Sequence, residues 1–334
     1  MTSDKLNLLD AYMEALYTLA CKAQGPDTRT IDPQSIANFT RGMHEAGADV
    51  TPEVLDAFEK LNSLHKETGE LIHAIGTQMP KEYRTLFMRP SSSSTGIEAI
   101  NNINSVMGRI QAGQHEVVQR LTAHVNTMEM DIANAAAVER PRYFSGALPK
   151  GSVPDAGIVL AFATRESFLL GAKMLVTLAR NLKDDHRRMI SSPLLKHFYD
   201  KVHAADPQFI HPELGEAIGK LDHLYEDCES AIGKTDSYLQ DVHEATNGSG
   251  FFPPRLRVDL TSAVNTMTDA VEQILQAQQV VVTTIGMKII AIFERESNAE
   301  PETAAPTTAG SPSRPPVSTD EPANAQAWPR SHLT

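Results

Sequence analysis

Apolar residues recur at alternating steps of three and four along three long stretches of the chain. Two of these stretches begin at Leu214 and at Leu260. The first continues through Ile218, Leu221, Tyr225, Cys228, Ile232, Thr235, Leu239 and Val242, and the second through Val264, Met267, Val271, Ile274, Gln278, Val281 and Ile285. That spacing is typical of long helices packed lengthwise. We therefore expect helices over about 212–246 and 255–297, joined as an antiparallel hairpin.

The third stretch predicts a helix from Thr95 to about Val138, with a seam that begins at Ile100. Two consecutive four-residue steps around Leu121 indicate a stutter in the heptad pattern. Other amphipathic segments predict helices over 4–23, from Pro33, from Pro52 to about Met79, over 155–190 and over 192–204. Asp32-Pro33 and Thr51-Pro52 combine an N-cap residue with a proline at the first helical position.

Together these elements predict an all-α fold, an elongated antiparallel helical bundle with coiled-coil-like long helices and a disordered C-terminal tail. We expect residues 1–79 to form an N-terminal helical subdomain that packs on the bundle, and residues 80–297 to form the long-helix bundle. Residues 298–334 are rich in Pro, Ala, Thr and Ser and have too few large apolar side chains to offset the chain entropy of folding. Trp328 is isolated in this tail and is a candidate anchor for a binding motif; the alternative is an unstructured end.

Charge and cysteine content narrow the function classes. Thirty Lys and Arg against 42 Asp and Glu give a net charge of −12, which disfavours nonspecific binding to nucleic acid or anionic lipid. Cys21 and Cys228 lack the spacing of a thiolate metal site or a disulfide framework. We expect a cytoplasmic protein, or one exported without a cleavable signal peptide, because the N-terminal apolar run is interrupted by acidic residues.

No stretch reaches the ~20 apolar residues expected of a membrane span. The nearest is 273–287, which is uncharged but contains Gln and Thr. The sequence also lacks the glycine-rich phosphate loops and the nucleophile and zinc motifs of common enzyme classes. We assign no catalytic residue and no cofactor.

Two short patterns resemble metal-ligand steps on a helix. Glu70-Leu-Ile-His73 has the Glu-x-x-His spacing found in carboxylate-bridged bundles, and Asp200-Lys-Val-His203 is a near match. Such a site needs further carboxylates from other helices. The alternative is that these residues are solvated on polar helix faces.

Single polar residues interrupt the apolar seams near the middle of each long helix, at Gln114, Thr235 and Gln278. A buried amide needs a partner, and such residues commonly fix helix register. We expect the three residues at similar heights, forming one polar layer; the alternative is that each lies at a seam edge and bonds to water.

Residues 280–293 are apolar around most of a helix. The seam there drifts from Lys288 toward Ile289 and Ile292, so that Val281, Ile285, Ile289 and Ile292 form the candidate contact line. Such a helix is either central in the bundle or covered by a partner.

These observations favour a non-enzymatic helical-bundle interaction protein, a scaffold, adaptor or secretion-associated component, that binds a protein partner or a second copy through helix faces. A membrane-active protein that inserts an apolar helix is the first alternative. A metal-dependent enzyme with a site inside the bundle is the second.

Overall fold

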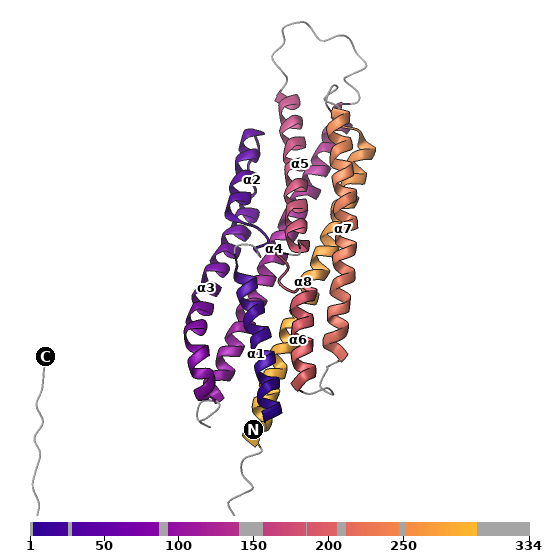
Figure 1. Cartoon of the computed structure of the whole chain (residues 1–334). Helices are drawn as coiled ribbons and strands as arrows, with labels where there is room; N and C mark the ends of the chain where they lie inside the picture. Colours follow the sequence, from indigo (N-terminus) through magenta and orange to yellow (C-terminus); the bar gives the residue numbers. More distant parts are fainter. Residues whose placement is uncertain are drawn as a thin grey trace, which may run out of the picture. The chain divides into compact units, whose positions relative to one another are not determined.

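The computed structural model describes residues 3–25, 29–86, 93–139, 156–184, 186–205, 212–246 and 252–298. Within these residues the fold is all-α (Figure 1), and the helices are α1 (Ser3–Gln24), α2 (Pro33–Glu45), α3 (Pro52–Leu86), α4 (Ser93–Glu139), α5 (Ala156–Lys183), α6 (Ser192–Ala205), α7 (Pro212–Thr246) and α8 (Pro254–Asn298). The predicted helical bundle is therefore confirmed.

Local chemistry explains several helix ends. Asp32 caps α2 as predicted, because its Oδ1 accepts a hydrogen bond from the Ser35 backbone N–H at 2.8 Å. The prediction for 155–190 was too long, since α5 ends at Lys183. The Asp184 side chain accepts a hydrogen bond from the His186 backbone N–H at 2.9 Å. This N–H group is then not used for a helical hydrogen bond, and the chain forms a turn after Lys183.

The predicted break after Met79 also differs from the structure. Helix α3 continues through Pro80 to Leu86, and α4 begins at Ser93, slightly before Thr95. The predicted boundary between residues 79 and 80 therefore falls inside a helix.

Helix α4 packs against three of the other long helices, and each pairing is antiparallel. On the α3 side, Arg109 and Glu67 form a two-pronged ion pair, and Glu116 pairs with Lys60. On the α5 side, the His124 ring lies 3.2 Å from the Ser167 hydroxyl. The backbones of α3 and α5 approach that of α4 most closely, whereas α8 is held against α4 mainly through side chains.

The remaining pairings complete the bundle. Helices α5 and α7 are joined by ion pairs of Lys183 with Glu229 and of Arg180 with Asp236. Helices α1 and α6 lie side by side (Figure 1), with the Tyr12 and Phe198 rings in edge contact at 5.1 Å between centroids.

Most residues of the apolar seams predicted from the sequence are buried, whereas Ile218 and Leu239 are partly exposed. Leu260, Val264 and Ile274 of α8 are fully buried, as are Val125 and Leu121 of α4. The same core includes side chains of α1, α2 and α3, and residues 1–297 form one compact unit. A second unit begins at Asn298; apart from that residue, the predicted tail 298–334, including Trp328, lies outside the described residues.

A buried tyrosine links the connection between α5 and α6 to the α7–α8 hairpin. Tyr225 of α7 donates a hydrogen bond to the Ile190 carbonyl at 3.4 Å and accepts one from Gln278 Nε2 of α8 at 3.1 Å. The Arg188 guanidinium lies over the Tyr225 ring, 4.0 Å from its centroid. Burial raises the pKa of Tyr225 to about 12, so the phenol keeps the proton that it donates.

Candidate interaction surface

Polar side chains line the interface between α4 and α8 over most of its length. Thr122 and Thr268 share a hydroxyl hydrogen bond at 2.9 Å, and Asn126 donates to Asn265 at 3.3 Å. One turn further along α4, Glu129 forms an ion pair with Arg257, with 2.8 Å between Oε1 and Nε. As the residue number rises on one helix it falls on the other, so these contacts define an antiparallel register. We call this interface the polar seam.

Small residues let the amides of the polar seam approach the facing backbone. A Cβ added to Gly286 of α8 would lie 1.8 Å from the Asn104 amide nitrogen of α4. At Gly108 of α4 an added Cβ would lie 3.2 Å from the Gln279 amide nitrogen. The two glycines therefore make room for amides that would otherwise be excluded.

The polar seam also contains an unsatisfied amide. Gln111 lies on the α4 stripe that faces α8 and is only 4% exposed. Within the described part of the chain, neither its Nε2 nor its Oε1 has a hydrogen-bond partner. A buried, unpaired amide costs roughly 1–3 kcal/mol.

The three polar interruptions predicted as one layer have different surroundings. Gln278 bonds to Tyr225, as described above, and the register places it about one helical turn from Gln114, which is also buried. Thr235 donates to the Ala231 carbonyl of its own helix at 2.9 Å and lies ten residues along α7 from Tyr225. That all three residues share one layer stays a prediction. None of these contacts joins Thr235 to Gln114 or Gln278.

The predicted contact line on α8 faces the core. Val281, Ile285 and Ile289 are fully buried, and Ile292 is 8% exposed. The chain itself therefore covers this side of residues 280–293, and only the opposite side of α8 is available to a partner.

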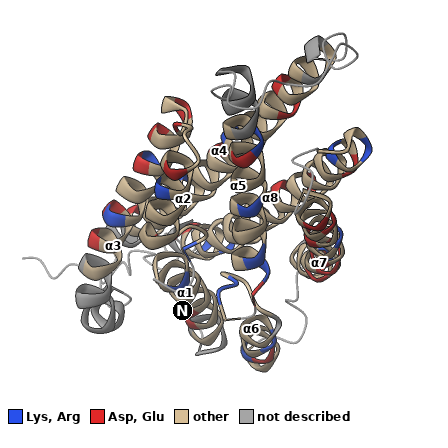
Figure 2. Cartoon of the chain, turned by 90° about the horizontal axis from the view of Figure 1, so that it is seen from above, with Lys and Arg blue, Asp and Glu red and all other residues tan. Residues whose placement is uncertain are grey.

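That opposite side forms a mostly uncharged strip with a heptad spacing of its own. Val280 and Met287 are 51% and 56% exposed, the largest apolar contributions to it. The exposed residues, which we call the α8 strip, are Ser262, Thr266, Asp269, Gln273, Gln276, Val280 and Met287. Asp269 is the one charged residue among these seven. In the view of Figure 2, uncharged positions likewise dominate α8.

Helix α4 extends this surface on the same side of the polar seam. Besides Arg109 and Arg120, its exposed side carries the uncharged residues Ala112, Gln119, Ala123, Thr127 and Met130. Met130 is 56% exposed and lies level with Val258 of α8, which is 55% exposed. We call the α8 strip, Val258 and these uncharged α4 residues the α4–α8 face.

The exposed side of α7 has the opposite character, and Figure 2 shows its acidic residues clustered on the outside of the helix. The exposed carboxylates include Asp222, Glu226, Asp227, Asp241 and Glu244. The α4–α8 face is thus a neutral region on a chain whose net charge is −12.

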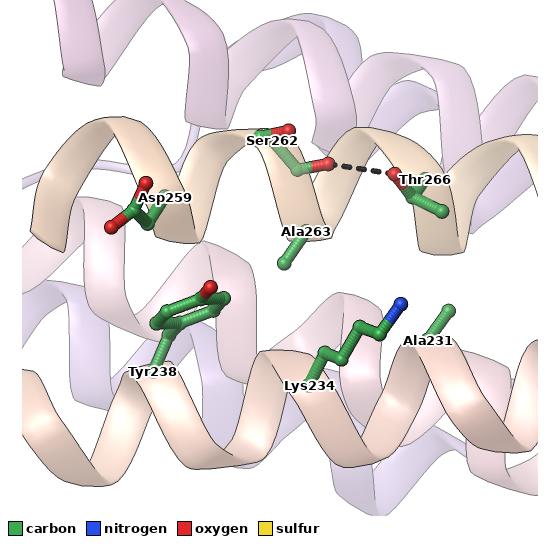
Figure 3. Close-up of a pocket in the computed structure, with 7 residues that line it drawn as sticks. All are labelled: Ala231, Lys234, Tyr238, Asp259, Ser262, Ala263 and Thr266. Carbon is green, nitrogen blue, oxygen red and sulfur yellow. Dashed lines mark hydrogen bonds between the residues drawn. The ribbon is translucent and has the colours of Figure 1, made fainter.

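Two shallow grooves flank the first half of α8. The groove toward α7, of about 190 Å³, is lined by Lys234 and Tyr238 of α7 and by Asp259 and Thr266 of α8, among others (Figure 3). The groove toward α4, of about 360 Å³, is lined by Glu129, Asn265 and Asp269, among others. Ser262 and Thr266 line both grooves, so α8 forms a ridge between them.

The groove toward α7 lacks the arrangement of a nucleophilic site. Such a site needs a hydroxyl within hydrogen-bond reach of a base. Thr266 instead donates to the Ser262 carbonyl at 3.0 Å, and the nearest cation to Asp259 is Arg255, at 3.7 Å on the same helix.

The weak metal candidates are dispersed. Glu70 and His73 are exposed on α3, and Asp200 and His203 are exposed on α6, where Asp200 pairs with Lys196. Across the described residues no group of three or more His, Cys, Asp or Glu side chains is arranged to hold a metal ion. A di-iron site would require a second carboxylate–histidine step and further carboxylates beside Glu70 and His73. The described residues do not form such a cluster.

Two histidines that the sequence did not single out are buried. His65 of α3 is fully buried, and neither ring nitrogen has a hydrogen-bond partner within the described residues. Burial, reinforced by the neighbouring Arg29 guanidinium, lowers the pKa of His65 from 6.5 to about 4. Burial also lowers the pKa of His124. Neither ring lines a groove described above, so both histidines are part of the packing.

Sequence reasoning missed the polar seam and the α8 strip, although both have a signal. In each, polar residues recur at steps of three and four, and each polar residue lies a few positions after a residue of an apolar seam. On α8, Ser262, Thr266, Gln273, Gln276 and Val280 follow the buried residues at an offset of two. The absence of charge over 273–287, considered above only as a membrane signal, is the same feature.

Among the described residues, one helix is long and apolar enough to be a candidate membrane span. It covers Pro254–Arg295, with a mean hydropathy of 1.3 over its best 18-residue window. More than half of that window, 56%, is buried within the fold. Buried core helices of folded proteins that never enter a membrane meet the same criterion.

Comparison with known proteins finds no match to a family model, to a curated protein or to a solved structure.

Replacing Gln111 by Leu should stabilise the fold by about 1 kcal/mol or more, because a side chain of similar size then fills the same space without an unpaired amide. Replacing Gln278 by Leu is the matched control. It removes the bond to Tyr225 and should destabilise the fold by about 1 kcal/mol. Urea denaturation of both variants measures the free energies of unfolding; a destabilised Gln111→Leu variant would show that the amide is satisfied.

The stability of the protein should fall as the pH drops from 6.5 toward 4, because unfolded His65 binds a proton in that range and folded His65 does not. The full loss attributable to His65 is roughly 3 kcal/mol. His65→Leu should remove this part of the pH dependence, whereas His73→Leu, at an exposed position of the same helix, should retain it. Chemical denaturation of both variants across this pH range tests the assignment, and equal slopes would refute it.

Proposed function

We propose that this chain is a non-enzymatic interaction protein that binds another protein through the α4–α8 face. The observation that carries the proposal is the α8 strip, a heptad-spaced line along which Asp269 is the one charged residue, on a chain with a net charge of −12. A partner helix that packs there desolvates mainly uncharged side chains, with Asp269 as the one carboxylate of the strip.

The shape of the surface supports the same proposal. Helix α8 forms a ridge between two shallow grooves, and exposed Val258, Val280, Met287 and Met130 are distributed along the face. Ridges and adjacent grooves are the means by which helices pack against each other. The proposal moves the contact from Val281, Ile285, Ile289 and Ile292, which the core covers, to the opposite side of α8.

A photo-crosslinking amino acid placed at Gln276 should capture a protein partner in the cells that produce this chain. The same amino acid at Ser230, exposed on the acidic side of α7, is the control and should capture much less. The adducts are resolved by gel electrophoresis and identified by mass spectrometry. Equal capture at both positions, or no capture at Gln276, would contradict the proposal.

The apolar window of α8 supports a second candidate function, insertion into a membrane. Insertion requires α8 to separate from α4 and α7. After separation, the side chains of the polar seam can form hydrogen bonds with water. Separation of α8 from α4 therefore costs less free energy than separation of two helices joined by an apolar seam. Protonation of His65 would favour opening at acidic pH.

For this second candidate, release of dye from neutral phosphatidylcholine vesicles should rise as the pH falls from about 7 to about 4. Gln276→Lys, which adds a charge that persists across this pH range, should suppress the release, whereas Ser230→Lys on α7 should not. Vesicles that stay intact across the whole range would remove the candidate.

A further inference from the structure

We propose that the partner of the α4–α8 face is a second copy of this chain, with two α8 strips packed antiparallel about a two-fold axis between Gln273 and Gln276. This inference rests on the proposed function and names its partner. It is argued from the spacing, the charge and the direction of the α8 strip.

The spacing of the strip fits a helix with the same spacing. The exposed residues follow steps of four and three from Ser262 to Val280, and Thr283, which is partly buried, fills the step before Met287. Two helices with this repeat can interdigitate along their length. The chain therefore contains a partner of the required geometry, which is its own α8 strip.

The charge distribution limits where two copies can meet. Two chains of net charge −12 repel each other, most strongly where the exposed carboxylates of α7 would face one another. The α4–α8 face avoids this repulsion, because Asp269 is its one carboxylate among the residues defined above. A basic partner, in contrast, would be drawn to α7 and not to a neutral face.

Asp269 also selects the direction. In a parallel pair, each Asp269 would lie beside its copy, and like charges at an interface are unfavourable. In an antiparallel pair centred between Gln273 and Gln276, Asp269 lies opposite Val280. The two Asp269 residues are then eleven positions apart, or about 16 Å along the helix axis.

The antiparallel pair places complementary groups at its centre. Gln273 of one copy lies opposite Gln276 of the other, and the two-fold axis repeats that pair. A glutamine amide both donates and accepts hydrogen bonds, so the two side chains can satisfy each other. Toward each end, Val280 lies opposite Asp269 and Met287 lies opposite Ser262 of the other copy, so that their methyl groups cover the flanks of polar side chains.

A single line of exposed residues with few large apolar side chains makes a small interface. Interfaces at the low end of the size range give weak, reversible association, so we expect a dimer with a Kd in the micromolar range.

Sedimentation velocity of the full chain, measured from about 1 to about 200 μM, tests the inference. The double substitution Gln273→Lys and Gln276→Lys should weaken dimerisation at least ~10-fold, because it places like charges at the two-fold axis. The double substitution to Glu should do the same. An equimolar mixture of the two variants should dimerise again as a heterodimer, because each Lys then faces a Glu.

Ser230→Lys with Ser237→Lys, at exposed positions of α7, is the matched control and should dimerise as the unmodified chain does. Circular dichroism checks that every variant retains its helix content. Failure of the Lys–Glu mixture to restore the dimer, or equal weakening by the α7 control, would overturn the inference.

The outcome also separates this inference from the proposed function. A monomer at every concentration, together with capture of a different protein at Gln276, overturns the second-copy inference and leaves the proposed function standing. A monomer with no capture at Gln276 overturns both. A dimer that all the variants leave unchanged places the self-contact elsewhere and overturns this inference.

Discussion

The antiparallel contact between α4 and α8 fixes the arrangement on which the rest of the structure depends. Polar pairs such as Thr122–Thr268 and Asn126–Asn265 are hydrogen-bonded in one register, and a shift by one turn would separate them. Apolar seams tolerate sliding better, because one methyl group can replace another. With α8 set against α4 in this way, its apolar side faces the core and its uncharged strip faces outward. The polar seam therefore determines which side of α8 a partner can meet.

The helices were largely predictable from the sequence because their apolar residues follow one period. Leu260, Val264 and Ile274 were expected on a seam and are buried. The ends were less predictable, because they depend on single side chains. The Asp184 carboxylate competes with the helix for backbone N–H groups and ends α5 early, and Pro80 does not end α3. Periodicity carries no information about either event.

The candidate surface was harder to predict than the fold. An apolar series shows that a helix has a buried side, but it does not show which neighbour covers it or which residues stay in water. Val281 and Ile285 were therefore considered as contacts, although the core covers them. Gln273 and Gln276 were visible as uncharged residues, but their role depends on where α4 and α7 lie. Burial of His65 likewise follows from the positions of α1 and α4 and not from its own neighbours in sequence.

The Tyr225 hydroxyl joins three segments that are far apart in the sequence. It bonds to the Ile190 carbonyl and to Gln278, and the ring lies under Arg188. If α8 moves away from α7, the Gln278 bond breaks, and the hydroxyl that holds the α5–α6 connection loses its other partner. Separation of the hairpin and loosening of that connection are thus thermodynamically coupled. The bundle should open in one cooperative step, and α8 should not detach by gradual fraying from its end.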